Sequence, residues 1–229
     1  MKPREFIAEA ERLLITRADP EKAAGMAAYM QQRFEYLGVQ TPIRVEIIKP
    51  LLKSVKAVAD EAWLSSTALL LWKKPKREYQ YVALDLIETY KKQLTAEGAR
   101  FLEGLAATKS WWDTVDYLAS KQFGPLVLRF PTLARQMDSY SKHPNFWLRR
   151  MAILHQLNSK EKTDASRLFR YCTLNAGSEE FFIRKAIGWA LCQYARTDAK
   201  AVIGFVQANR SRLSSLSVRE ALKHFPDKL

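Results

Sequence analysis

A repeat of 35 residues constrains the fold of this chain more than any other feature of its sequence. Arg149, Arg184 and Arg219 lie 35 residues apart, each within an apolar frame, and Trp112 precedes Trp147 by the same interval. A period of about 34–47 residues with two helices per unit is typical of helical solenoids, in which each repeat packs against its neighbours. The repeat therefore predicts an all-α fold that is an α-α superhelix.

Between the repeat positions, apolar residues recur at the spacing of α-helices. Eight glycines in 229 residues are few for a turn-rich β protein. One apolar stripe runs from Pro20 to Leu37 and predicts a helix that ends at Gly38, a residue type common just after helix ends. We expect a single domain over residues 1–229. The same periodicity predicts further helices over residues 78–90, 97–107, 146–157, 165–175, 179–195 and 198–208.

The charge of the chain predicts an anionic partner. Lys and Arg number 37 against 24 Asp and Glu, which gives a net charge of +13. Residues 142–229 contain 16 Lys and Arg but only 7 Asp and Glu. Nucleic acid is the first candidate and an acidic membrane surface the second. We expect a phosphate backbone to lie along the C-terminal part.

Several classes of protein are disfavoured. No apolar run reaches about 18 residues, and the N-terminus lacks the apolar core of a signal peptide, so we expect neither a membrane-spanning nor a secreted protein. Cys172 and Cys192 are then expected to be reduced thiols in the cytosol. Together with His143, His155 and His224 they show no metal-ligand spacing, so no metal or cofactor is expected.

The segment Lys109-Ser110-Trp111-Trp112-Asp113-Thr114-Val115-Asp116 holds the strongest candidate for chemistry. Ser110 and Asp113 fit a capping pair at the start of a helix. Asp116 lies one turn further in, where capping does not explain it. Trp112 and Asp116 are four residues apart, so they share a helix face. An aromatic ring beside a carboxylate suits a cationic ligand or transition state, although spacing alone leaves Asp116 equally compatible with solvent.

Two basic pairs, Arg149-Arg150 and Arg184-Lys185, occupy equivalent positions of the repeat. One interpretation is a solvated surface or ion pairs between repeats. The other is a row of charges in register along a groove, which is an arrangement that can follow DNA phosphates. The sequence leaves both open.

Other aromatic residues have ordinary explanations as packing residues. Trp111 is expected to pack between repeats, Trp189 to belong to a helix core, and Tyr29 to be half-buried. Gly188 is unusual beside Trp189, because glycine weakens a helix by roughly 1 kcal/mol. Close approach of another helix or of a partner would justify it.

Five segments together resemble the AlkD-type family of bacterial DNA alkylation-repair glycosylases, and the match covers nearly the whole chain in order. The Trp-Trp-Asp-x-Val-Asp core is its most specific part, because arginine-containing helical repeats are common. The segments are Tyr36–Pro42, Lys109–Asp116, Asn145–Arg150, Phe181–Trp189 and Leu216–Leu222.

This resemblance implies a fold, a class of substrate and a cellular location. The family's fold is a C-shaped array of six HEAT-like repeats, whose concave, positively charged cleft binds duplex DNA. Its members hydrolyse the N-glycosidic bond of cationic alkylated purines such as N3-methyladenine and N7-methylguanine, without flipping the nucleotide into a pocket. We therefore expect a monomeric, monofunctional enzyme in the bacterial cytoplasm, associated with the nucleoid through DNA.

The resemblance also implies roles for individual residues. Asp116 matches the catalytic carboxylate, and Trp112 and Trp189 match aromatics that line the lesion's deoxyribose. Arg150 matches a basic residue of the cleft, and Tyr29 an aromatic near the same site. From the basic repeats, the further DNA-binding candidates are Arg149, Arg184 and Lys185.

Two other functions remain open at this stage. A non-catalytic protein that binds DNA structures on the same fold would have no use for a carboxylate facing phosphates, so Asp116 argues against it. A helical-repeat scaffold for protein interactions would have an apolar or mixed-charge groove, whereas basic pairs in register predict an electropositive one.

Overall fold

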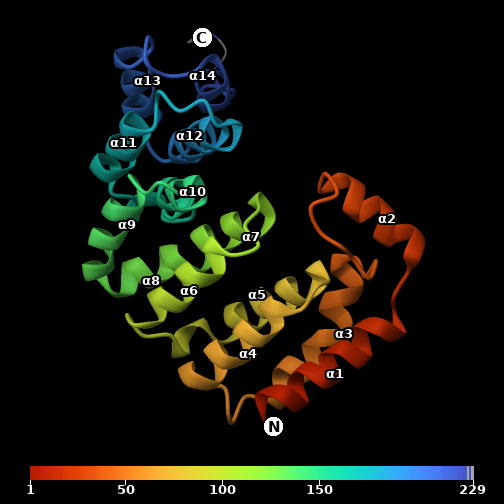
Figure 1. Cartoon of the computed structure of the whole chain (residues 1–229). Coiled ribbons are helices and arrows are strands. Elements are labelled where there is room, and N and C mark those ends of the chain that lie inside the picture. The colour runs from red at the N-terminus through yellow and green to blue at the C-terminus, as the bar shows by residue number, and fades with distance from the viewer. Residues whose placement is uncertain (226, 228–229) are drawn as a thin grey trace. The chain divides into compact units, whose positions relative to one another are not determined.

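The computed structural model describes residues 1–225 and 227, and these residues form helices without any extended strand. One isolated bridge joins Glu35 and Lys76. The chain divides into two compact units, Met1–Phe101 and Leu102–Leu229 (Figure 1). The prediction of an all-α, helical-repeat fold is confirmed. The prediction of one domain over the whole chain stays a prediction.

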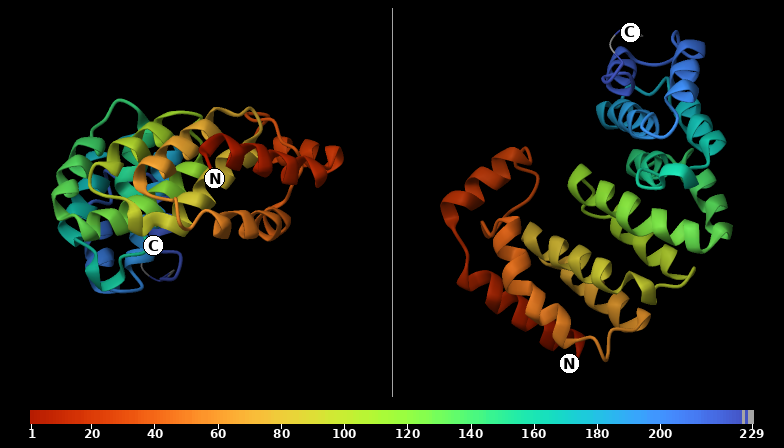
Figure 2. Two further views of the ribbon diagram at one scale, coloured as in Figure 1. Left: turned by 90° about the horizontal axis from the view of Figure 1, so that it is seen from below. Right: turned by 180° about the vertical axis from the view of Figure 1, so that it is seen from behind.

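The first unit is built around α5, which packs against both α3 and α4, while α1 also packs against these two helices (Figures 1 and 2). Its core contains Phe6, Ile48, Leu64 and Ile87, all fully buried. The elements of this unit are α1 (Pro3–Thr16), α2 (Pro20–Tyr29), α3 (Thr41–Ser54), α4 (Glu61–Lys73), α5 (Arg77–Tyr90) and the short 3-10 helix η1 (Lys91–Gln93).

The second unit consists of helices in two layers (Figure 1). In one layer α7 packs against α10, α10 against α12, and α12 against α14; in the other layer α9, α11 and α13 pack against them. The elements in chain order are α6 (Gly98–Ala107), which starts just before the unit boundary, α7 (Trp112–Tyr117), the π-helix η2 (Leu118–Phe123), α8 (Gly124–Arg129), the 3-10 helix η3 (Pro131–Leu133), α9 (Ala134–Tyr140), α10 (Phe146–Leu154), the 3-10 helix η4 (Lys160–Lys162), α11 (Ala165–Leu174), α12 (Phe181–Tyr194), α13 (Ala199–Ala208) and α14 (Ser215–Ala221).

The close packing of α12 and α14 explains Gly188. A Cβ atom at Gly188 would lie 2.4 Å from the Cβ of Glu220 and 2.9 Å from the carbonyl oxygen of Ser217. Only glycine therefore lets α14 approach α12 this closely. Of the two explanations that the sequence left open, the structure shows the approach of another helix.

The predicted helix from Pro20 to Leu37 is wrong in its second half. Helix α2 ends at Tyr29. Gln31 and Gln32 follow with φ angles of 56° and 58°, which is a left-handed conformation that no helix continues. The apolar residues beyond this point belong to a loop, and Gly38, with φ 90°, lies in that loop rather than at the end of a helix.

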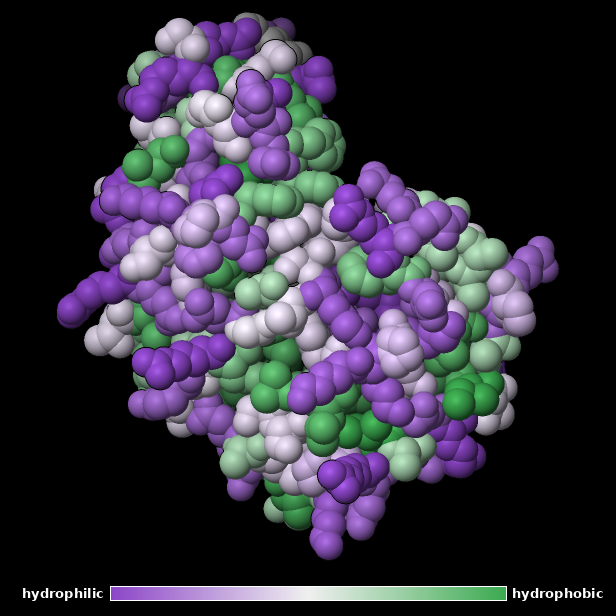
Figure 3. All heavy atoms as spheres, viewed as in Figure 1, coloured by the Kyte–Doolittle hydropathy of each residue, from purple (hydrophilic) through white to green (hydrophobic). Residues whose placement is uncertain are grey.

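The surface of the molecule is largely hydrophilic in the view of Figure 3, where hydrophobic side chains form separate patches. The most exposed large hydrophobic residues include Tyr29 and Phe181. Cys172 and Cys192 are buried free thiols. Within the described part of the chain, no helix is both long and apolar enough to cross a membrane.

Candidate active site

Helix α7 carries the two residues that the sequence places on one face, Trp112 and Asp116. Trp111 is the N-cap residue of α7. The predicted cap by Ser110 is wrong, because the Ser110 hydroxyl donates instead to the carbonyl oxygen of Ala106 at 2.6 Å, in the preceding helix α6. Asp113 does lie in the first turn of α7, where the helix dipole favours a carboxylate.

Trp111 packs between repeats, as the sequence predicts. It is buried, and its ring lies 5.6 Å from that of Trp147 and 5.0 Å from that of Phe182. These three aromatic residues lie at the starts of α7, α10 and α12. The aromatic cluster thus fixes the N-terminal ends of the helices that carry the candidate site.

The carboxylate of Asp116 is held by Arg150 of α10 in a two-pronged ion pair. Arg150 Nε donates to Asp116 Oδ1 at 2.6 Å, and Arg150 Nη2 donates to Asp116 Oδ2 at 2.7 Å. This geometry matches the planar fork of arginine to both carboxylate oxygens. The two residues are 34 apart, one short of the repeat, and they meet because α7 and α10 pack against each other.

Arg150 also reaches the third helix of the site. Its Nη1 atom donates to the carbonyl oxygen of Phe182 in α12, and its guanidinium carbon lies 5.8 Å from the centre of the Phe182 ring. The side chain of Arg150 is 4% exposed and that of Asp116 is 14% exposed. The pair therefore ties α7, α10 and α12 together, while the carboxylate keeps a small contact with solvent.

The environment of Asp116 acts on its pKa in opposite directions. Burial raises the pKa of Asp116 above the ordinary aspartate value, and the hydrogen bonds and positive charge of Arg150 oppose this rise. The negative charge of Asp113 raises the Asp116 pKa further. Because arginine stays charged at all ordinary pH values, we expect Asp116 to be ionised at neutral pH. A carboxylate has about four acceptor positions, of which Arg150 uses two.

The π-helix η2 begins directly after α7, two residues beyond Asp116. Pro125 has no N–H to donate to the carbonyl of Ser120, five residues earlier, and that carbonyl accepts from Asn158 Nδ2 at 3.1 Å instead. Gly124 lies so close to His155 that a Cβ atom would be 2.1 Å from its carbonyl oxygen. π-Helical turns are frequent at functional sites. The Gly124-Pro125 pair is the sequence signal for this feature, which helical periodicity alone does not predict.

The two tryptophans expected to line the site, Trp112 on α7 and Trp189 on α12, are both half-buried. Their helices both pack against α10. The half-burial leaves part of each ring surface accessible. Their contact with a ligand stays a prediction.

Arg149 and Arg184 have local partners that repeat with the same period. Arg149 Nη1 donates to the carbonyl oxygen of His143 at 2.8 Å, and Arg184 Nε donates to that of Ser178 at 2.8 Å. Each arginine thus binds the loop before its own helix. Both remain partly exposed. Whether they also contact phosphates stays a prediction.

Lys185 and Tyr29 differ in their surroundings. Lys185 forms an ion pair with Glu220 of α14 at 2.7 Å, which matches the interpretation as a contact between repeats. Tyr29 ends α2 in the first unit and is 72% exposed rather than half-buried. The other named residues all lie in the second unit.

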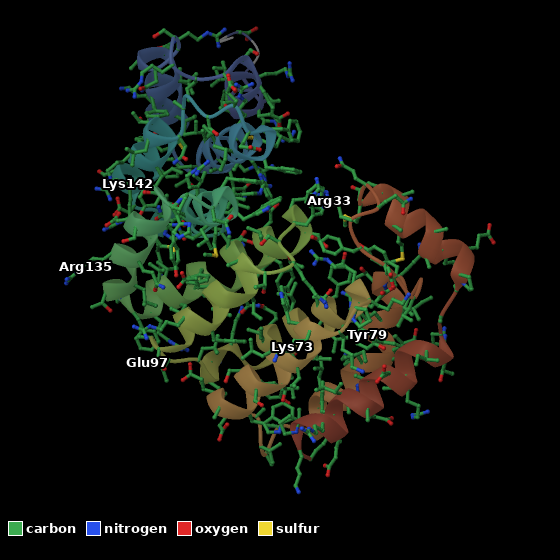
Figure 4. The ribbon with its side chains drawn as sticks, in the orientation of Figure 1. Arg33, Lys73, Tyr79, Glu97, Arg135 and Lys142 are labelled. Carbon is green, nitrogen blue, oxygen red and sulfur yellow. The ribbon has the colours of Figure 1, made fainter. Side chains whose placement is uncertain are left out.

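Further exposed basic residues, Arg135 and Lys142, point outward at α9 and just beyond it (Figure 4).

No group of three or more His, Cys, Asp or Glu side chains suited to a metal ion is found among residues 1–225 and 227. A cavity of about 220 Å³ lies in the second unit between α10, α11 and α12. None of the predicted site residues lines this cavity. The candidate site is the ion pair of Asp116 on α7 and Arg150 on α10, in which the carboxylate is 14% exposed and the arginine side chain 4%.

Comparisons with known proteins agree with the arrangement of the helices. The sequence model of the family described as DNA alkylation repair enzyme matches residues 10–225. A solved structure from Enterococcus faecalis, described as a predicted DNA alkylation repair enzyme, superposes with a TM-score of 0.84 at 35% sequence identity. The match covers 91% of this chain and 96% of that one. No curated protein matches the chain significantly.

Proposed function

Because the chain belongs to the family of DNA alkylation repair enzymes, we propose that it is a DNA glycosylase that releases cationic alkylated purines from duplex DNA. Its substrates in this proposal are N3-methyladenine and N7-methylguanine. It acts as a monomer in the bacterial cytoplasm, without a metal or cofactor, and leaves the damaged nucleotide within the duplex rather than in an extrahelical pocket.

One observation carries the proposal: a carboxylate, Asp116, is held in a fixed orientation by Arg150 and retains a small exposed surface. It lies on the same short helix as the half-buried Trp112. A structural ion pair alone would not require an aromatic residue on the same helix face, one turn before the carboxylate. The combination suits the stabilisation of positive charge.

The chemistry follows from the charge of the substrate. When the bond between C1′ and the purine nitrogen breaks, its electron pair neutralises the cationic base, which leaves without needing an acid. Positive charge then develops on the sugar, and the Asp116 carboxylate stabilises it. Water attacks C1′, and its proton passes to Asp116 or to solvent. No lysine is assigned as a nucleophile, so the reaction ends at an abasic site.

Arg150 acts in this proposal by positioning Asp116. Its guanidinium lies against the carboxylate and the Phe182 carbonyl, and its side chain is almost completely buried. This assigns it a different role from the phosphate contact expected from the sequence. Trp112 and Trp189 add roughly 0.5–2 kcal/mol each where a ring face meets the cationic sugar.

The test is incubation of methylated duplex DNA with the wild-type protein and with Asp116→Asn, followed by chromatography of the released bases. Asp113→Asn is the matched control, because Asp113 lies on the same helix. The proposal predicts base release by the wild type and by the control, and strongly reduced release by Asp116→Asn. Equal release by all three would refute the role of Asp116. No release by the wild type, with salt-dependent binding retained, would indicate a DNA-binding protein.

A further inference from the structure

Residues Asp19–Val39 form an arm of the first unit that consists of α2 and the loop after it (Figure 1). We call this segment the α2 arm. None of the ten residues of α2 is buried. Helices in proteins are usually stabilised by the apolar face that they bury. The position of α2 therefore depends on the segments at its two ends, which include the buried Met30 and the junction of Asp19 with Leu37 and Gly38, here called the base of the arm.

A backbone hydrogen bond joins the two ends of the arm at its base. The Asp19 N–H donates to the carbonyl oxygen of Leu37 at 2.8 Å. Gly38 has a φ angle of 90°, and a Cβ atom there would lie 1.9 Å from the Asp19 carbonyl oxygen. Glycine at this position is thus required for the two ends of the arm to meet.

A buried carboxylate, that of Glu78 on α5, binds the base of the arm through hydrogen bonds. Glu78 is fully buried. Its Oε1 atom accepts the backbone N–H groups of Leu37, Gly38 and Val39 at 3.0, 2.9 and 3.2 Å. Hydrogen bonds to a carboxylate are stronger than those between neutral groups. Three successive backbone groups are therefore fixed by one side chain.

The two residues before Glu78 bind the neighbouring part of the loop. The Arg77 N–H donates to the Glu35 carbonyl oxygen at 2.8 Å, and the Arg77 guanidinium carbon lies 3.8 Å from the centre of the Phe34 ring. Lys76 pairs with the Glu35 carboxylate at 3.0 Å. Residues at the start of α5 thus contact the loop from Phe34 to Val39.

We propose that Glu78 is a positioning residue for DNA binding, which holds the α2 arm so that Tyr29 is presented to the duplex. This inference rests on the proposed function. Glu78 is buried, so it acts through the arm rather than by touching DNA, whereas Tyr29 at the end of α2 is largely exposed. The loop that follows also carries Arg33, which Figure 4 shows beside α2.

The experiment compares Glu78→Gln with the wild type in two measurements. Hydrogen exchange measures how fast the Leu37, Gly38 and Val39 amide protons exchange with solvent. Fluorescence anisotropy measures the affinity for undamaged duplex DNA. We expect exchange at these amides to accelerate and the dissociation constant to rise by about tenfold, the equivalent of one charge-assisted hydrogen bond. Unchanged affinity despite faster exchange would overturn the inference.

Asp85→Asn is the matched control. Asp85 also lies on α5 and forms an ion pair with Arg44 of α3 at 3.0 Å. Removing this charge should lower the melting temperature while the affinity stays near that of the wild type. If Asp85→Asn weakens DNA binding as much as Glu78→Gln, the effect is one of general stability and the inference fails.

A double-mutant cycle with Tyr29→Ala tests the route of action. If Glu78 acts by placing Tyr29, then Tyr29→Ala costs less affinity in the Glu78→Gln background than in the wild type. Independent, additive losses would contradict this. If Glu78→Gln does not fold, Gly38→Ala opens the base of the arm directly and should give the same loss of affinity. Failure of the wild type to bind DNA would instead refute the proposed function.

Discussion

The ion pair between Asp116 and Arg150 gives a prediction about a single and a double variant. Asp116→Asn removes the negative charge that we propose to stabilise the sugar cation, but leaves the buried guanidinium of Arg150 in place. Asp116→Asn combined with Arg150→Gln removes both charges. If the carboxylate acts electrostatically, the double variant should release bases faster than the single one, although it carries more substitutions.

The magnitudes follow from the geometry of the pair. At an effective dielectric constant of about 20, a carboxylate about 4 Å from the sugar cation stabilises it by about 4 kcal/mol. The guanidinium nitrogens lie 2.6 and 2.7 Å beyond the carboxylate oxygens. At about 8 Å from the cation, the guanidinium opposes stabilisation by about 2 kcal/mol. The single variant should therefore be slowed by about a thousandfold and the double variant by only about thirtyfold.

The assay is single-turnover release of N7-methylguanine from methylated duplex DNA, with enzyme in excess. Circular dichroism checks that each variant is folded, because an unpaired buried charge costs stability. Affinity for undamaged duplex should change little, or increase, in Asp116→Asn. A double variant as slow as the single one, or slower, would refute the electrostatic account of Asp116 and leave the pair as a structural contact.

Three further predictions concern stability and DNA binding. Gly188→Ala should destabilise the protein by about 1–3 kcal/mol in urea unfolding, because its Cβ would collide with the Ser217 carbonyl, and an unchanged stability would mean that α14 shifts freely. Burial lowers the pKa of His155 to about 4. The unfolded chain takes up this proton near pH 6.5 and the folded one does not, so the free energy of unfolding should fall by about 3 kcal/mol from pH 6.5 to 4; His155→Gln should lose this pH dependence. Arg184→Ala should reduce the salt slope of duplex binding by about 1, and an unchanged slope would exclude a phosphate contact.

Much of the fold of the second unit could be predicted from the sequence, because its helices each bury one apolar face and recur with a fixed period. The helix over residues 179–195 is observed as α12, and Gly188 marks its close contact with α14. The α2 arm could not be predicted in this way. Its apolar residues continue at helical spacing past Tyr29, but they bury against α5 from a loop, and only the left-handed Gln31 and Gln32 end the helix.

The sequence indicated which residues form the candidate site, but not which of their side chains bind each other. The four-residue spacing placed Trp112 and Asp116 on one helix face, and both lie on α7. The partner of Asp116 was not predicted, because a spacing of 34 residues to Arg150 does not say which side chains of adjacent helices meet. The hydroxyl of Ser110 donates to the Ala106 carbonyl oxygen near the end of α6 and does not cap the start of α7, because a serine hydroxyl can bind either helix end and its spacing does not say which.

Identification of the products formed from methylated duplex DNA tests the central claim most directly. A glycosylase releases the intact methylated purine as a free base and leaves an abasic site in an unbroken strand. We predict N3-methyladenine and N7-methylguanine in the soluble fraction, with strand cleavage only after alkaline treatment. Recovery of the methyl group on the protein, or restoration of the unmodified purine within the strand, would contradict the account.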